Sequence, residues 1–205
     1  MKKSLGKTIG AVILSAAFAV TGCNKEQTDA SVANSVNASD QTQVVFNGLD
    51  TIPKILKVPR GNRLKKFGYA TGVQIYQVQR SITDPNVFSW VNIAPAATLY
   101  NAPDFTDQFA IHYAGPTWEF TKGPNTGTKV VATKLQAVTE TPTAISWLLL
   151  KAVDSLSSPD NKITYVQRLY TAGGLAPTRG ANKKHLGELD SIPYTAIYFF
   201  YVARN

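Results

Sequence analysis

Closely spaced turn residues are the feature of this sequence that most limits its fold. Eleven prolines and fourteen glycines interrupt the chain, and the apolar stretches between them are short and rich in β-branched and aromatic residues. Such stretches are typical of strands, and the clearest three span residues 69–79, 163–170 and 195–202. Dense turns between short strands favour an all-β, mainly antiparallel barrel or sandwich with little helix over a helical bundle.

The stretch at residues 69–79 carries an apolar set on each of its two faces. These sets are Tyr69, Val73 and Ile75 on one face and Ala70, Tyr76 and Val78 on the other. Gly68 and Gly72 stand where a bulge or a close approach of two backbones suits a residue without a Cβ atom. We therefore expect a strand with local irregularities rather than a uniform one.

Other segments are less regular. The stretches at 163–170 and 195–202 are β-branched and aromatic on both faces, as buried strands are. Residues 146–155 fit a short helix and a strand equally well, because the apolar run is too short to separate the two periods. Residues 51–56 fit a short turn of helix.

The first 22 residues have the features of a lipoprotein signal peptide. A basic start containing Lys2 and Lys3 precedes an apolar run over residues 9–20, which is shorter than the roughly 20 residues of a membrane-spanning helix. Val20-Thr21-Gly22-Cys23 resembles the lipobox, in which the cysteine thiol takes the diacylglyceryl thioether. We therefore expect cleavage before Cys23 and attachment to a membrane through lipid on Cys23.

The remaining chain divides into a tether and one domain. Cys23 is the single cysteine, and lipidation would remove a reactive thiol from an oxidising compartment. Residues 23–43 are polar and poor in large apolar groups, which predicts a disordered tether, and residues 44–205 form one β-domain. Asn24, rather than an aspartate, follows the cysteine, which favours the outer membrane over inner-membrane retention.

Charge and motifs exclude several function classes. The 21 Lys and Arg outnumber the 13 Asp and Glu, but the signal peptide would remove three lysines and the rest are mostly dispersed, so nucleic acid is not an expected partner. No phosphate-binding or dinucleotide-binding glycine pattern is present, and Gly173-Gly174 fits a turn. The two histidines lack metal-ligand spacing, so neither a cofactor nor a metal is expected.

Several blocks of the chain, in a fixed order between about residues 55 and 203, are similar to the DUF3455 family. The blocks lie at residues 58–62, 72–76, 111–119, 147–150, 167–168, 171–177 and 192–201. The resemblance implies a secreted, single-domain protein of bacteria and fungi. It implies no established activity.

The chain departs from the family pattern at two positions. Members of the family tend to carry a cysteine at the positions of Val78 and Ala181, and this chain carries neither. If those cysteines form a disulfide in relatives, the resemblance implies that Val78 and Ala181 are neighbours here, with Cβ atoms within about 5 Å.

The stretch from His112 to Glu119 is the strongest candidate for a catalytic site. A turn at Gly115-Pro116 would fold it into a hairpin and bring His112 near Glu119, and such a pair can act as general acid and base near neutral pH. Alternatively, the pair is a buried hydrogen bond that closes the hairpin, with Tyr113 and Trp118 as core residues. Both interpretations stay open from the sequence.

Candidate binding residues lie on or beside the aromatic strands. They are Gln74, Tyr113, Trp118, Arg168 and Glu188. A buried polar group needs a partner, so we expect Arg168 to pair with Glu119 or Glu188. Aromatic and amide groups on a β-scaffold suit a sugar, and a barrel interior suits one small apolar ligand.

The sequence therefore predicts a membrane-tethered lipoprotein of the cell envelope whose β-domain binds a small molecule or a glycan without catalysis. An envelope hydrolase that uses His112 and Glu119 is one alternative, although no Gly-x-Ser-x-Gly sequence is present. A purely structural or interaction role is another. A pocket lined by His112, Trp118 and Glu119 would favour binding or catalysis, and a filled core would favour the structural role.

Overall fold

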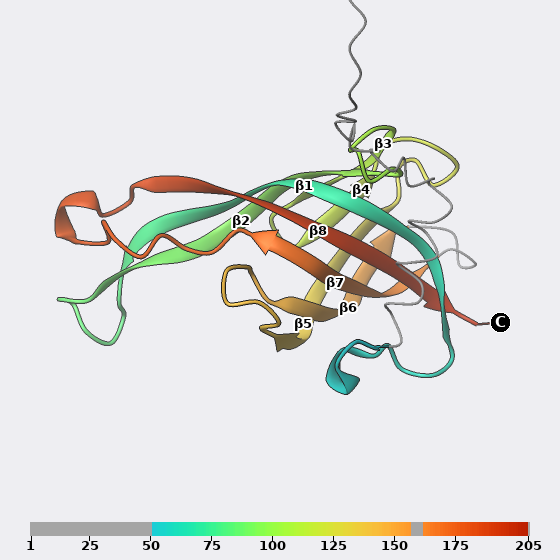
Figure 1. The fold of residues 1–205 in the computed structure, drawn as a ribbon, viewed down its shortest axis with the longest axis horizontal. Helices are drawn as coiled ribbons and strands as arrows, with labels where there is room; N and C mark the ends of the chain where they lie inside the picture. Colours follow the sequence, from blue (N-terminus) through green and yellow to red (C-terminus); the bar gives the residue numbers. More distant parts are fainter. Residues whose placement is uncertain (1–50, 157–161, 205) are drawn as a thin grey trace, which may run out of the picture. The chain divides into compact units, whose positions relative to one another are not determined.

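Eight antiparallel strands follow one another in chain order around a closed barrel, and β8 pairs with β1 (Figure 1). The computed structural model describes residues 51–156 and 162–204. The strands are β1 (Asn62–Arg80), β2 (Phe88–Tyr100), β3 (Gln108–Tyr113), β4 (Thr117–Phe120), β5 (Lys129–Val138), β6 (Trp147–Leu156), β7 (Ile163–Gly173) and β8 (Leu189–Ala203). The expected all-β class is confirmed, and the architecture is a barrel rather than a sandwich.

The predicted elements are found where the residue patterns placed them. The three predicted strands lie within β1, β7 and β8, and the ambiguous stretch at 146–155 forms β6. The short helical turn is η2 (Lys54–Leu56), and a second 3-10 turn, η4 (Lys183–His185), precedes β8. Within the described ranges, none of the helical segments has the length and apolar character needed to cross a bilayer.

Gly72 lets two strands approach closely. A Cβ atom at this position would overlap the backbone of Ala96 and Ala97 on β2, and Gly72 pairs with Ala97 across the two strands. The register of this pair shifts between Ile75 and Tyr76, so the predicted combination of close approach and bulge is present.

Large apolar side chains pack together inside the barrel. Trp118, Tyr198, Phe200 and Leu99 are almost completely buried, and they pack with other inward-facing residues into one cluster. On β1, Ala70, Tyr76 and Val78 point inward, as their alternation predicts.

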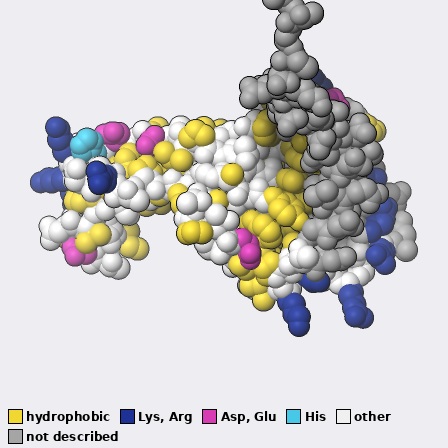
Figure 2. Space-filling view, viewed as in Figure 1, with side chains coloured by type: hydrophobic (Ala, Val, Ile, Leu, Met, Phe, Trp, Pro, Cys, Tyr) yellow, Lys and Arg dark blue, Asp and Glu magenta, His cyan; other side chains and the backbone are white. Residues whose placement is uncertain are grey.

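A second apolar cluster lies on the outer surface of the barrel, beneath the segment that contains η2. Leu56 packs there against Leu149, Leu169 and Phe199, and the carbonyl oxygen of Leu56 accepts a hydrogen bond of 2.6 Å from Nε2 of Gln167. Because the segment with η2 covers the outer faces of β7 and β8, these strands are apolar on both faces. On the face that Figure 2 shows, hydrophobic side chains cover much of the middle, and Lys and Arg stand mainly toward the margins.

Unequal strand lengths leave an opening in the barrel wall. β3 and β4 are short, so the described pairing of β2 with β3 involves only residues 97–100 of β2, and that of β5 with β4 involves only residues 129–131 of β5. Beyond these points β2 and β5 pair on one side only, with β1 and β6. Residues 92–95 of β2, Lys134 and Ala137 of β5 and the β3–β4 turn line one pocket at this place.

Candidate functional site

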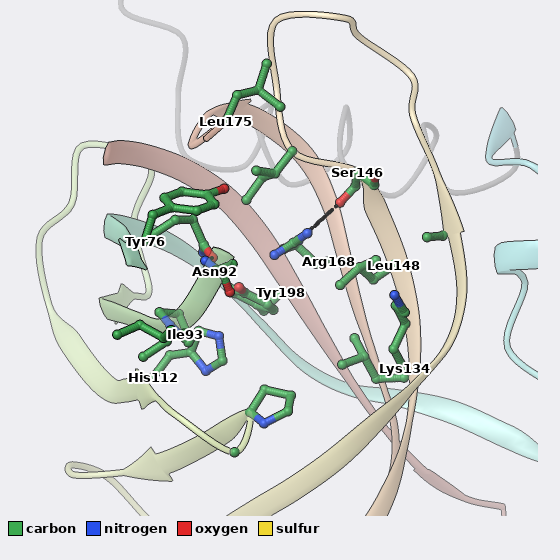
Figure 3. Close-up of a pocket in the computed structure, with 18 residues that line it drawn as sticks. Tyr76, Asn92, Ile93, His112, Lys134, Ser146, Leu148, Arg168, Leu175 and Tyr198 are labelled. Carbon is green, nitrogen blue, oxygen red and sulfur yellow. Dashed lines mark hydrogen bonds between the residues drawn. The ribbon is translucent and has the colours of Figure 1, made fainter. Parts of the chain in front are cut away.

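A cavity of about 600 Å³ lies inside the barrel at this opening (Figure 3). Gly115 and Pro116 of the β3–β4 turn line it together with residues 93–95 of β2 and Lys134 of β5. Half of the eighteen lining residues are aliphatic or proline. The remainder includes a small set of polar side chains: Gln74, Tyr76, Asn92, His112, Arg168 and Tyr198.

Arg168 brings a positive charge into the middle of the cavity. It extends from β7, and its Nε and Nη2 atoms donate to the carbonyl oxygen of Ser146 at 3.2 and 2.9 Å (Figure 3). Lys134 adds a second cation at the mouth, and none of the described residues that line the cavity is Asp or Glu. The lining is therefore positively charged.

Gln74 presents a buried hydrogen-bond donor. Its side chain is 4% exposed, and its Oε1 atom accepts a hydrogen bond of 2.9 Å from Nδ2 of Asn92. The same Asn92 nitrogen also donates to the carbonyl oxygen of Ile75, which determines which way both amides face. The Nε2 atom of Gln74 then makes no close hydrogen bond in the described part of the chain, and the side chain of Gln74 also interacts with the phenol of Tyr194.

His112 lies at the floor of the cavity as a neutral imidazole. Its ring stacks on Trp118 with centroids 4.4 Å apart, and burial lowers its pKa from 6.5 to about 4 despite the hydrogen bond to Thr117. Because the partner of Nδ1 is the Thr117 carbonyl oxygen at 2.8 Å, Nδ1 must carry the proton. The Nε2 atom is therefore a hydrogen-bond acceptor.

Three tyrosines supply neutral hydroxyl groups around Arg168. The hydroxyl of Tyr76 donates to the Gly174 carbonyl at 2.6 Å, and the hydroxyls of Tyr194 and Tyr198 lie 3.2 Å apart. Burial raises the pKa of each of the three phenols. They stay protonated at neutral pH and do not compensate the charge of Arg168.

A family model described as a protein of unknown function (DUF3455) matches residues 59–202. The chain belongs to the DUF3455 family. The model spans all eight strands except the last residue of β8, so this DUF3455 domain includes the whole cavity. No curated protein and no solved structure matches the chain.

The expected pairing of His112 with Glu119 in this DUF3455 domain is wrong. The hairpin is present, but a turn at residues 114–116 pairs His112 with Trp118 and Ile111 with Glu119. Because successive residues of a strand point to opposite faces, Glu119 lies on the outer face. There it accepts a hydrogen bond of 3.0 Å from Tyr113 and lies 3.3 Å from Nζ of Lys129.

The expected pairing of Arg168 with a glutamate is also wrong. Glu119 pairs with Lys129, and Glu188 lies in the loop before β8 at 2.5 Å from Nδ1 of His185. A backbone carbonyl instead satisfies part of the Arg168 guanidinium. Among the residues that the structure describes, no three His, Cys, Asp or Glu side chains come together as a metal site requires.

The structure brings together only part of the predicted residue set. His112, Gln74 and Arg168 line one cavity, and Trp118 is buried beneath His112. Tyr113 and Glu188 lie elsewhere, as described above, and Cys23 lies outside the described residues.

Sequence reasoning missed Asn92, Lys134 and Tyr198 as cavity residues. Alternation offered one usable signal, because Gln74 and Tyr76 are two residues apart on β1 and must share a face. The opening in the barrel wall makes Asn92 and Lys134 part of the site. No local sequence pattern indicates this opening.

The loop that contains Ala181 lies near Val78. Val78 pairs with Trp90 across β1 and β2, and Nε1 of Trp90 donates to the carbonyl oxygen of Arg179 at 2.7 Å. The amide of Gly187 donates to the carbonyl oxygen of Val78. The separation of the Val78 and Ala181 Cβ atoms stays a prediction.

Proposed function

We propose that this domain binds a small molecule in the barrel cavity and does not catalyse its conversion. The cavity itself is the observation that carries the proposal. Its volume of about 600 Å³ lies within the roughly 300–1,000 Å³ of small-molecule sites, and such sites combine apolar walls with a few convergent polar groups. Gln74, His112 and Arg168 are groups of this kind.

The surroundings of His112 support binding rather than catalysis. A histidine that acts as a general base is usually oriented by a carboxylate and faces a nucleophile. Here Nδ1 of His112 faces a backbone carbonyl oxygen, and the nearest predicted carboxylate, Glu119, is on the other face of the hairpin. A neutral imidazole in this setting suits the recognition of a hydrogen-bond donor.

The substitution Ala137→Trp should abolish binding of a neutral apolar probe. Ala137 lines the mouth of the cavity at an exposed position, so an indole there can occupy the opening without disturbing the core. We expect the fluorescence increase of N-phenylnaphthylamine on binding to be lost in this variant. The matched control is Ala203→Trp, at an exposed position that does not line the cavity. Equal binding by both variants would place the probe outside the cavity and contradict the proposal.

We further propose that this domain is carried by a lipoprotein of the cell envelope, anchored in the outer membrane through Cys23. The support is the order of basic, apolar and lipobox residues that ends at Cys23. One lipid chain gives only reversible attachment, whereas several give a stable anchor.

Mass spectrometry of the mature protein should find Cys23 at the N-terminus with lipid attached. Cys23→Ser removes the thiol that forms the thioether, so we expect this variant to lose the modification and to leave the outer-membrane fraction. A wild-type protein with an unmodified Cys23, or one found free in the periplasm, would overturn the lipoprotein proposal without affecting the proposal for the cavity.

A further inference from the structure

We infer that the cavity is selective for a small anion with an apolar body, such as a carboxylate or sulfonate on a ring or chain, and that Arg168 binds the anionic group. This inference rests on the proposed small-molecule function and specifies the chemistry of the ligand. The charge of Arg168, the amide donor of Gln74 and the apolar walls of the cavity support it.

Arg168 is a partly buried cation without a counter-ion among the residues that the structure describes. Transfer of a charge out of water is costly unless the charge is paired. Among the described residues, Glu119 pairs with Lys129 and Glu188 contacts the imidazole of His185, and no acidic side chain lines the cavity. The Ser146 carbonyl oxygen takes two of the five guanidinium N–H donors. An anionic ligand would supply the missing negative charge.

The Nε2 atom of Gln74, which makes no close hydrogen bond among the described residues, points to the same ligand class. A buried donor without a close partner is destabilising, and this one belongs to a side chain that lines the cavity. A carboxylate or sulfonate is rich in acceptor oxygens and can satisfy an amide donor as well as a guanidinium. Lys134 at the mouth would attract the same charge from solution.

The walls favour an apolar body on that anion. Ile93 of β2 and Leu148 of β6 lie on opposite sides of the space, and Leu175 lies on a third side (Figure 3). Pro95 and Leu150 also line the cavity. A fully hydrated inorganic anion would leave these groups in contact with water. An anion with an aromatic or aliphatic part would bury them, and removal of their apolar surface from water would favour binding.

Two fluorescent probes that differ by one sulfonate group test the inference. Anilinonaphthalene sulfonate and N-phenylnaphthylamine share one aromatic skeleton, and only the first carries an anionic group. In the purified full-length protein we expect the anionic probe to bind more tightly than the neutral one. Arg168→Met keeps approximately the side-chain length and removes the charge. It should raise the Kd of the anionic probe by about tenfold to hundredfold, as expected for the loss of a charged hydrogen bond.

In the same variant, the Kd of the neutral probe reports any general change in the cavity, so the ratio of the two Kd values isolates the effect of the charge. Arg60→Met is the matched control, because Arg60 is exposed in the turn before β1 and its loss should change neither Kd. An unchanged ratio in Arg168→Met overturns the assignment of Arg168.

A competition experiment on the wild-type protein decides the inference even if Arg168→Met does not fold. Naphthoate should displace N-phenylnaphthylamine at concentrations at least tenfold lower than naphthalenemethanol, its neutral counterpart. Equal displacement would refute selectivity for anions while leaving the small-molecule function intact. If neither probe binds the wild-type protein, the proposed function itself is wrong.

Discussion

Replacing Trp118 with alanine is expected to lower the free energy of unfolding by about 3–5 kcal/mol. The indole is 1% exposed. It stacks on His112 with the ring planes 6° apart and contacts Tyr198 and Phe200 edge-on at 5.4 and 6.1 Å. Its removal would leave a void between three rings from β3 and β8. Thermal unfolding should show a melting temperature lower by roughly 6–20 °C for a domain of this size.

Two further tryptophan variants, one at Trp118 and one in the outer cluster, make this prediction specific. Trp118→Phe keeps an aromatic ring and removes the indole N–H, which has no hydrogen-bond partner among the described residues, so its loss of stability should be clearly smaller. Trp147→Ala removes a half-buried indole from the outer cluster and should also cost less. A melting temperature of Trp118→Ala equal to that of wild type would show that the ring cluster does not hold the barrel together.

The stability of the domain is expected to fall by about 3 kcal/mol as the pH drops from about 6.5 to 4, because of His112 alone. Burial lowers the pKa of His112 in the folded state from 6.5 to about 4. Between these values the unfolded chain binds a proton that the native state does not, so acid favours unfolding. Above about pH 7.5 both states carry the neutral imidazole, and His112 contributes no pH dependence.

Urea unfolding at a series of pH values measures this effect. His112→Phe keeps a ring that can stack on Trp118 and removes the titrating group, so the difference between the wild-type and variant profiles isolates the histidine from the carboxylates. We expect that difference to change between about pH 6.5 and 4 and to be constant above about pH 7.5. Parallel profiles would mean that His112 is hydrated, which would contradict its 4% exposure.

Strand positions could be predicted because they depend on local chemistry. Alternation and β-branched residues placed β1, β7 and β8, and Gly72 indicated a close approach of strands before its partner on β2 was known. The stretch that forms β6 stayed ambiguous, since it is apolar on both faces. Its helix period and strand period fit equally well until the inner core and the outer cluster gave each face a partner.

The relation between His112 and Glu119 could not be predicted from the residues alone. Their spacing is compatible with a hairpin, but a shift of one residue in the pairing moves a side chain to the opposite face. The observed turn at residues 114–116 places His112 inside and Glu119 outside. Register is settled by the partners on β2 and β5, which are remote in sequence.

The sequence by itself determined the all-β class, the family, the main strands and the presence of polar residues that needed partners on aromatic strands. The tertiary structure alone decided that Gln74, His112 and Arg168 meet in one cavity. That meeting depends on closure of the barrel by β1 and β8 and on an opening left where β3 and β4 end early. Both are long-range pairings between segments far apart in the chain, and local alternation carries no information about which strand edges remain unpaired.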